Sequence, residues 1–363
     1  MTEVRLVTIG DDLTSAENSQ VQDLIAEFTD VFVLSVSEVK QVEGAVHRLN
    51  ISPDAKFLTK VHQKPLTPPQ RRYLHEKLQA MLDADVVEPC EPGQVKCVSP
   101  TTLVQKTHEG AGLTLDELQH QVNDECIRNG LQPHFPLPPR PPPAVDETEV
   151  KKDEPKWRIC QNFSQINKVT QVAPMPQEDI RAKQQRLSGH RWVSTFDFAA
   201  GFYAVIVEPE SRPYMAFYVE GWGYFWYKRM LFGLTGAPST FAHMTGQHLY
   251  DLLIDEVMEL FVDDSGTAAN VFSEMMDKLR RIFTRVHEQG LSLSASKSKF
   301  FMTTAKFAGA TVGPNGVQPD LSKLMAIINW KTPENVLNLS SFLGLTGWFR
   351  DLIKDYAKIE TPL

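Results

Sequence analysis

The sequence predicts an α+β fold, in which helices cover one face of an antiparallel sheet. Segments with the patterns of strands and helices alternate along the chain, without the regular units that build a parallel sheet. No internal repeat is present, and 42% of the 363 residues are hydrophobic, which is enough for a sizeable core. No apolar run reaches the roughly 18 residues that a membrane span needs. Because the N-terminus also lacks the pattern of a secretory signal, we expect an intracellular protein.

The first half of the chain alternates between strand and helix signals. Residues 1–44 form an acidic N-terminal arm. The segment HRLNIS then alternates like a strand, and the TPP tripeptide at 67–69 opens a helix, because a first turn accommodates proline. KCVSPTTLVQK and KWRICQNF are strand-like and flank an insertion at 107–150, which contains PLPPRPPPA. We interpret the insertion as exposed on the surface, part helix (LTLDELQHQVNDECIRNG, ending at Gly130) and part linker. The alternative for the proline-rich stretch is a ligand for a partner domain.

The second half carries the stronger signals. HRWVSTFDF is an apolar strand, and GWGYFWYKRMLF contains a hairpin turn at Gly221 and Gly223. VMELFVDD is a further apolar strand. Ser273 is expected to cap a helix that has a basic C-terminal half and ends at Gly290. Two short strands follow, and we then expect helices around residues 320–329 and 336–354.

The charge is distributed unevenly along the chain. The net charge is −8, but residues 1–40 carry −6 and residues 107–150 carry another −6, so the remainder carries +4. The acidity therefore belongs to the arm and the insertion. A groove for a phosphate backbone stays compatible with the mildly basic remainder.

Two adjacent aspartates and one distant aspartate carry the main functional signal. Asp263 and Asp264 follow an apolar strand, and both can face one site only at a tight turn, which we assign to Ser265-Gly266. On their own they are also typical of a solvated Asp-Asp turn. Asp197 lies in a second apolar strand, where a charge is costly unless it is paired or bound to a metal.

If these two strands share one sheet, the three carboxylates converge. Close carboxylates repel one another, and a hard divalent cation removes that penalty. Mg²⁺ takes oxygen ligands and keeps positions open for waters and phosphates. Two such ions are able to activate a 3′-hydroxyl and to stabilise a leaving pyrophosphate.

Neighbouring residues fit the same chemistry. Lys151 and Arg158 are candidates to neutralise a triphosphate, and a solvated charged hairpin is the alternative. Phe202 follows three small residues after Asp197, so its ring is placed either to exclude a sugar 2′-hydroxyl or to pack in the core. Between residues 278 and 299, one acidic residue, Glu288, accompanies six basic ones: Lys278, Arg280, Arg281, Arg285, Lys297 and Lys299. These bases either bind a phosphate backbone or form an ordinary solvated helix face.

Taken together, these segments resemble the reverse transcriptase of gypsy-type (Metaviridae) LTR retrotransposons. WRICQNFSQINKVT is similar to the family's W-R-x-C-x-D-Y-R-x-L-N-K segment, and LFGLTGAPSTF to its P-F-G-L-x-N-A-P-x-T-F signature. FVDD is similar to the Y/F-x-D-D box, KFAGATV to the primer grip, and SSFLGLTGWFRDLIKDYAKIETPL to the thumb. The likeness runs in order from about Ala45 to Leu363. The insertion and VTQVAPMPQEDIRAKQQRLSGH resemble the lineage of basidiomycete fungi.

The resemblance implies a right-hand polymerase that adds deoxynucleotides to a primer 3′ end on an RNA or DNA template. The implied layout is fingers at 45–196, a palm at 197–318 that includes part of the fingers around 205–232, and the start of a thumb at 319–363. The family continues into an RNase H domain where this chain stops, so we expect RNase H and integrase to be absent from it. Expected partners are a template-primer, deoxynucleoside triphosphates and other polyprotein parts, in a cytoplasmic virus-like particle or the nucleus.

The resemblance also implies roles for individual positions. Asp197, Asp263 and Asp264 would be catalytic and would bind two Mg²⁺ ions, or Mn²⁺, with the backbone carbonyl of Phe198. The nucleotide would contact Lys151, Arg158, Phe202 as a steric gate, Phe232 and Gly233. The primer or template would contact Phe261, Val262, Lys297, Lys299, Phe307, Ala308, Gly309, Ala310 and Thr311.

The sequence also departs from the family pattern. Asn162 and Ser164 replace an Asp and an Arg of the fingers strand, and Leu231 replaces the usual Pro. An inactive relic that keeps the fold and binds nucleic acid is therefore one alternative. Another two-metal enzyme, such as a nucleotide cyclase, is the second alternative, but it leaves LFGLTGAPSTF and the thumb-like segment unexplained.

Overall fold

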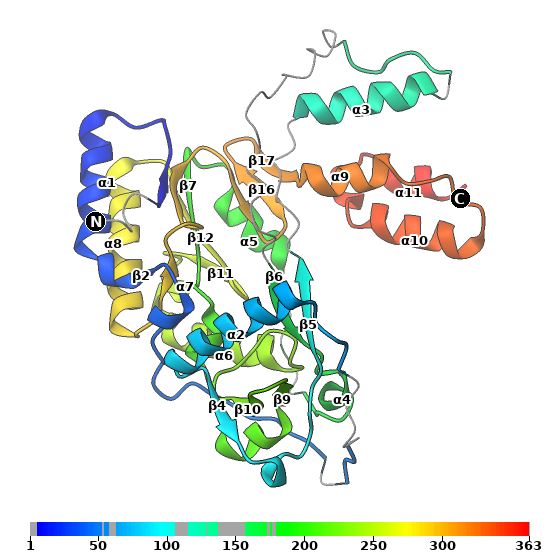
Figure 1. Ribbon diagram of the computed structural model, residues 1–363. Coiled ribbons are helices and arrows are strands. Elements are labelled where there is room, and N and C mark those ends of the chain that lie inside the picture. The colour runs from blue at the N-terminus through cyan, green and yellow to red at the C-terminus, as the bar shows by residue number, and fades with distance from the viewer. Residues whose placement is uncertain are drawn as a thin grey trace. The chain divides into compact units, whose positions relative to one another are not determined.

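The computed structural model describes residues 6–52, 54–57, 63–105, 115–128, 130–136, 157–172, 175 and 179–362 (Figure 1). The chain divides into two compact units. The first comprises Met1–Lys106, Pro155–Ala308 and Val312–Val317, and the second comprises Thr107–Glu154, Gly309–Thr311 and Gln318–Leu363. Within the described part of the chain, no helix is both long enough and apolar enough to traverse a membrane.

The first unit is organised around a mixed sheet with the described strand order β1-β14-β7-β12-β11. The edge pair β1–β14 is parallel, whereas the pairs β14–β7, β7–β12 and β12–β11 are antiparallel. The strands are β1 (Thr8–Ile9), β14 (Lys299–Met302), β7 (Trp192–Asp197), β12 (Asp264–Ala269) and β11 (Glu259–Phe261).

Helices cover both faces of this sheet, and not one face as the sequence pattern predicted (Figure 1). Because side chains alternate along a strand, Trp192 and Phe196 of β7 pack in the large core with α8 (Phe272–Glu288). Val193 points the other way and packs with Leu187 of α5 (Ile180–Leu187). The sheet is therefore covered on two sides, which explains why successive residues of β7 are buried.

Helix α8 follows the predicted position but not the predicted cap. Its N-cap is Val271, whose side chain cannot accept a hydrogen bond, and Ser273 lies inside the first turn. The helix is held by burial of one face, formed by Met275, Leu279, Ile282, Phe283 and Val286. Gly290 follows the helix with a φ of +65°, as expected for a glycine that ends a helix.

The acidic N-terminal region packs on α8. Helix α1 (Ser15–Glu27) lies beside α8, and β1 and β2 (Phe32–Val33) pair with strands of this unit. Glu27 pairs with Arg280 at 2.6 Å, and Asp30 lies 2.6 Å from His287. The negative charge of this region therefore complements the basic face of α8.

Smaller sheets and helices complete the first unit. The three-stranded sheet β4-β10-β9 contains the predicted hairpin, with Gly221 and Gly223 at positive φ. The strands of the smaller sheets in this unit are β3 (Val46–His47), β4 (Val87–Cys90), β5 (Thr101–Gln105), β6 (Trp157–Gln161), β8 (Ile206–Val207), β9 (Ala216–Val219), β10 (Gly223–Tyr227), β13 (Leu293–Ser294) and β15 (Ala305–Phe307). The α-helices are α2 (Pro68–Asp83), α4 (Ser164–Asn167), α6 (Ala237–His248) and α7 (Tyr250–Ile254). The 3₁₀ helices are η1 (Thr29–Val31), η2 (Val36–Glu38), η3 (Pro92–Gln94), η4 (Gly201–Ala204) and η5 (Pro209–Tyr214).

The second unit is mainly helical in its described residues. Helix α9 lies against both α3 and α10. The helices are α3 (Leu115–Arg128), α9 (Leu321–Ile328), α10 (Val336–Gly347), η6 (Arg350–Leu352) and α11 (Tyr356–Glu360). The strands β15, β16 (Ala310–Gly313) and β17 (Gly316–Pro319) form a small sheet, and the residues of β16 and β17 are divided between the two units.

One buried histidine makes the stability of the first unit sensitive to acid. His47 is 2% exposed, its Nδ1 lies 2.9 Å from Thr240 Oγ1, and its Nε2 has no hydrogen-bond partner among the described residues. Burial lowers the pKa of His47 from 6.5 to about 4. The unfolded chain then binds more protons below pH 6.5. The stability is therefore fully present above pH 6.5 and is lost as the pH falls towards 4, by on the order of 3 kcal/mol at most.

Urea unfolding at pH 4.5, 5.5 and 7 measures this effect. The free energy of unfolding of His47→Gln should depend less steeply on pH than that of the unsubstituted protein. Parallel pH profiles for the two proteins would show that His47 is not the group responsible.

Candidate metal centre and nucleotide site

Strand pairing brings the predicted aspartates together. In the antiparallel pair of β7 and β12, Asp197 lies directly opposite Asp264. In the pair of β11 and β12, Phe261 lies opposite Asp264, which leaves Val262 and Asp263 as a two-residue loop. Opposed residues project from the same face of a sheet, so the carboxylates of Asp197 and Asp264 emerge side by side with Asp263 at the adjoining tip.

The sequence predicted a turn at Ser265-Gly266, because glycine is common in tight turns. This prediction is wrong, since the turn beside the doublet lies at Val262 and Asp263. Ser265 and Gly266 lie within β12, where the Ser265 hydroxyl donates to the Phe196 carbonyl oxygen at 2.6 Å. The Gly266 backbone lies close to β7, so an added Cβ would approach the Ser194 carbonyl oxygen to 3.1 Å. This glycine therefore serves close strand packing, not a turn.

The true turn places a β-branched residue in an unfavourable conformation. Val262 has a φ of +58°, whereas Asp263 is not among the residues of positive φ. A two-residue hairpin with positive φ only at its first position normally has glycine there. A valine held in this region costs on the order of 1–3 kcal/mol, and such strain persists only where surrounding structure enforces it. The register on both sides of β12 supplies that constraint.

The three carboxylates influence one another electrostatically. Burial raises the pKa of Asp197, and the charge of Asp263 raises it further, while Lys297 acts in the opposite direction. Burial, followed by the charge of Asp263, likewise raises the pKa of Asp264, against a hydrogen bond from the Ala308 N–H. Partly desolvated carboxylates whose pKa a neighbouring carboxylate raises favour a bound cation, because a cation offsets both burial and repulsion.

Two of the carboxylates already have partners. The Lys297 ammonium donates to both Oδ atoms of Asp197 at 3.1 Å, and the Ala308 N–H donates to Asp264 Oδ2 at 3.2 Å. As the described side chains stand, no three of the His, Cys, Asp and Glu residues surround a point that could hold a metal ion. Lys297 is 65% exposed and reaches Asp197 from solvent. The donor set is that of a hard divalent cation, with Lys297 as the present counter-charge of Asp197.

An aromatic cluster lies directly after Asp197. Ala200 has a φ of +44° and leads into η4, where the Phe202 ring is buried. The Phe202 ring lies 4.2 Å from that of Phe232 and 5.2 Å from that of Phe241, measured between centroids. Phe232 is 60% exposed and covers Phe202. The Phe202 ring therefore packs in the core beneath an exposed ring, and its role as a steric gate stays a prediction.

The loop after Phe232 is fixed by a residue that sequence reasoning missed. Asn167 donates from Nδ2 to the Gly233 carbonyl oxygen at 2.7 Å, and its Oδ1 accepts from the Thr235 N–H at 2.9 Å. Gly233 has a φ of +91°, which favours glycine. Asn167 lies in the INK segment, and its two bonds span a separation of 66 residues or more, so no local pattern indicates them.

The remaining residues that were predicted to bind metal, nucleotide or template differ in their exposure to solvent. Phe198 is buried and forms a backbone bridge with Leu293. Arg158 is exposed on β6 opposite Val104, and Lys151 lies outside the described residues. Lys299 is exposed on β14 opposite Thr195.

The primer-grip segment forms a tight turn. Ala308 and Gly309 have φ values of +45° and +75°, as in a type I′ hairpin turn, and Phe307 is buried before them. Gly309, Ala310 and Thr311 belong to the second compact unit.

Four of the bases on α8 have acidic partners within the protein. The pairs are Lys278–Glu274, Arg280–Glu27, Arg281–Asp255 and Arg285–Asp251. This pairing favours the interpretation of α8 as an ordinary charged face and leaves less charge for phosphates.

Residues 150–312 match the family model "Reverse transcriptase (RNA-dependent DNA polymerase)". The Drosophila melanogaster Pol polyprotein from transposon 297 is 27% identical over 68% of this chain and 23% of its own length. That from transposon gypsy is 27% identical over 68% of this chain and 24% of its own length. The chain thus spans about a quarter of these relatives.

A solved structure supports the fold. The foamy viral protease-reverse transcriptase in complex with double-stranded DNA has a TM-score of 0.72 and 17% identity, over 99% of this chain and 53% of that one. The predicted α+β right-hand polymerase fold is confirmed by this likeness. Residues 150–312 are thus similar to reverse transcriptases, and the chain's relatives include Pol polyproteins of gypsy-type retrotransposons.

Proposed function

We propose that the chain is the polymerase portion of a reverse transcriptase, which adds deoxynucleotides to a primer 3′ end on an RNA or DNA template. The observation that carries this proposal is the opposed pair Asp197 and Asp264, with Asp263 at the adjoining hairpin tip. A reverse transcriptase domain spans these residues. The fungal lineage and the whole polyprotein's partners stay predictions.

Asp197, Asp263 and Asp264 would hold two Mg²⁺ ions, or Mn²⁺, with the Phe198 carbonyl as a further oxygen. When bound, such ions polarise the primer 3′-hydroxyl and neutralise charge on the transferring phosphate. Without the ions, the Lys297 ammonium is the counter-charge of the Asp197 carboxylate, and this ion pair would have to break when the ions bind. Asn167 holds the loop at Gly233, so that the Phe232 ring stays over Phe202 beside the nucleotide.

A primer-extension assay tests the proposed function. A 5′-labelled DNA primer on an RNA template, with four deoxynucleoside triphosphates and Mg²⁺, should be elongated to the template end, and a DNA template should serve as well. Mn²⁺ should be tried in parallel. Folded protein that binds the template-primer without extending it would favour the inactive relic, and cyclic nucleotide as the product would favour the cyclase.

Replacing Phe202 with valine should raise ribonucleotide incorporation, because a smaller side chain leaves room for the 2′-hydroxyl. We expect the ratio of kcat/KM for deoxyribonucleotides to that for ribonucleotides to fall by about tenfold or more. Such a fall corresponds to the loss of about 1–3 kcal/mol of discrimination between the two substrates. Phe202→Tyr keeps the bulk of the ring and should keep the preference. An unchanged ratio in Phe202→Val would assign Phe202 to core packing alone.

A further inference from the structure

Helix α5 presents unusual polar residues to the sheet. Lys183 and Gln184 are each 7% exposed, although burial of an ammonium or an amide is costly without partners. Alternation along β7 and β12 places Asp197 and Asp264 on the same face as Val193 and Ala268, which is the face that α5 covers. The polar side of α5 is therefore on the side of the sheet that carries the aspartates.

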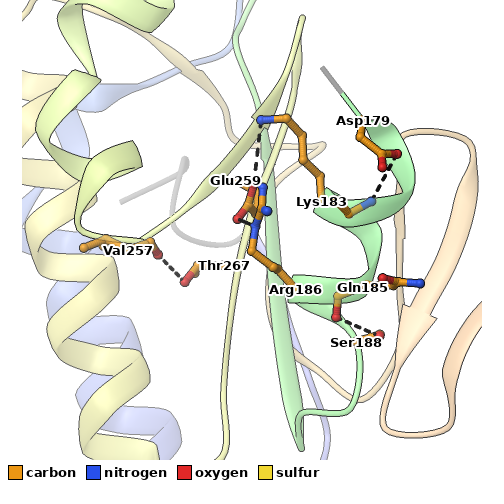
Figure 2. A network of polar contacts seen from close by, with 9 residues as sticks. Asp179, Lys183, Gln185, Arg186, Ser188, Val257, Glu259 and Thr267 are labelled. Atoms are coloured by element: carbon orange, nitrogen blue, oxygen red, sulfur yellow. Dashed lines mark hydrogen bonds and ion pairs between the residues drawn. The ribbon is translucent and has the colours of Figure 1, made fainter. Parts of the chain in front are cut away.

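One part of α5 is tied to the strand that leads into the aspartate doublet. Figure 2 shows Lys183 and Arg186 reaching from α5 towards Glu259, the first residue of β11. Arg186 donates from Nε and Nη2 to the two carboxylate oxygens of Glu259, the second at 2.9 Å, and Lys183 Nζ lies 3.7 Å from Oε2. The helix is thus fixed relative to the catalytic hairpin by a bidentate pair.

A second connection runs from α5 to Asp264 itself. The Gln184 side-chain amide donates to the Ala308 carbonyl oxygen at 3.0 Å, and the Ala308 N–H donates to Asp264 Oδ2 at 3.2 Å. Ala308 has a φ of +45°, which costs roughly 1–2 kcal/mol for an L-residue. Because this conformation is unfavourable, the direction of the Ala308 N–H depends on what holds the residue. In the described structure, Gln184 holds its carbonyl.

We propose that Gln184 is a positioning residue for Asp264: through the Ala308 backbone it holds the Asp264 carboxylate in the direction that a divalent cation requires. The inference rests on the proposed function, in which Asp264 is a metal ligand. Residues that orient a metal ligand from behind typically contribute 10- to 100-fold to metal affinity. Gln184 acts through one intervening residue, so we expect the lower end of that range.

The test variant is Gln184→Met, which keeps the length of the side chain and removes the donor. Its matched control is Gln185→Met, which makes the same change at the neighbouring exposed position of α5. Mn²⁺ binding to protein with template-primer is measured by electron paramagnetic resonance without any nucleotide, and the Mg²⁺ dependence of primer extension is measured separately. Gln184→Met should weaken Mn²⁺ binding about tenfold, and should raise the half-saturating Mg²⁺ concentration by a similar factor, with less effect on kcat at saturating Mg²⁺.

Further variants separate positioning from folding. Gln184→His retains an N–H donor and should restore most of the Mn²⁺ affinity. In an Asp264→Asn background, Gln184→Met should have little further effect, because a residue that acts through Asp264 is coupled to it. Mn²⁺ affinity unchanged by Gln184→Met, or equal additive losses in both backgrounds, would overturn the proposal, as would a loss of thermal stability alone.

The same titration distinguishes the two levels of inference. If the unsubstituted protein binds Mn²⁺ no better than Asp264→Asn, the metal centre of the proposed function fails. If the unsubstituted protein binds Mn²⁺ but does not extend a primer, the activity fails, and the binding data still decide the role of Gln184.

Discussion

Asp264→Asn is expected to reduce primer extension by roughly a thousandfold or more. Metal-ion stabilisation of a transferring phosphoryl group is worth several kcal/mol, and each 1.36 kcal/mol is about a factor of ten in rate. Asparagine keeps the size of the side chain and an oxygen, but it removes the negative charge. Asp197→Asn and Asp263→Asn should have effects of the same order, because the proposed ions need all three carboxylates.

Asp264→Asn should at the same time stabilise the metal-free protein. The pKa of Asp264 is raised by burial and by the charge of Asp263, so the folded state disfavours its ionised form. A raised folded-state pKa means that stability is present at low pH and is lost as the pH rises through that pKa. The asparagine variant lacks this loss, so its advantage should grow from acidic towards neutral pH.

Denaturant unfolding with a chelator, followed by single-turnover primer extension, measures both effects. Asp277→Asn is the matched control, since Asp277 is an exposed acid on α8 and should change neither quantity. An Asp264→Asn protein that unfolds more easily and loses activity would point to a structural role. One that keeps its activity would remove Asp264 from the metal centre.

Arg186→Met is expected to lower the free energy of unfolding by about 2–3 kcal/mol. The Glu259 carboxylate is about 10% exposed, and its described partners are Arg186 and Lys183. Removing one partner of a buried ion pair typically costs about 3–5 kcal/mol, because the remaining charge loses its compensation. The lower figure applies here, because the Arg186 side chain is 48% exposed and solvent screens it.

Replacing the whole network should recover much of that loss. In Lys183→Met/Arg186→Met/Glu259→Leu, no charge stays buried at this site, and apolar replacements of buried ion pairs are often neutral or stabilising. Arg72→Met on the exposed face of α2 is the control for loss of an arginine. Equal unfolding midpoints for Arg186→Met and Arg72→Met would show that the network contributes little to stability.

Local sequence patterns singled out the three aspartates but not the geometry that presents them. The aspartates were predicted because charges in apolar strands stand out against their neighbours. The turn was assigned wrongly because Gly266 is the residue that ordinarily makes a tight turn, whereas the structure imposes positive φ on Val262. Similarly, Ser273 has a good capping side chain, but burial of the α8 face determined where that helix begins.

Residues that act over long separations were missed for a related reason. Asn167 bonds a loop 66 positions away, and Gln184 bonds a carbonyl 124 positions away. Local patterns do not indicate such bonds, because the partner of each residue lies far away in the sequence. Likewise, the sequence does not indicate that Glu27 and Asp30 of the acidic N-terminal arm meet basic partners on α8.

By itself, the sequence determined the α+β class, the apolar strands, the three carboxylates and the likeness to reverse transcriptases. These features depend on periodicity and residue type, which are local properties of a chain. Only the tertiary structure decided that Asp197 faces Asp264, that Val262 makes the turn, and that α5 reaches Ala308 and Glu259. Register and burial arise from pairing between distant segments, because the free energy that selects them belongs to the packed sheet and not to any one segment.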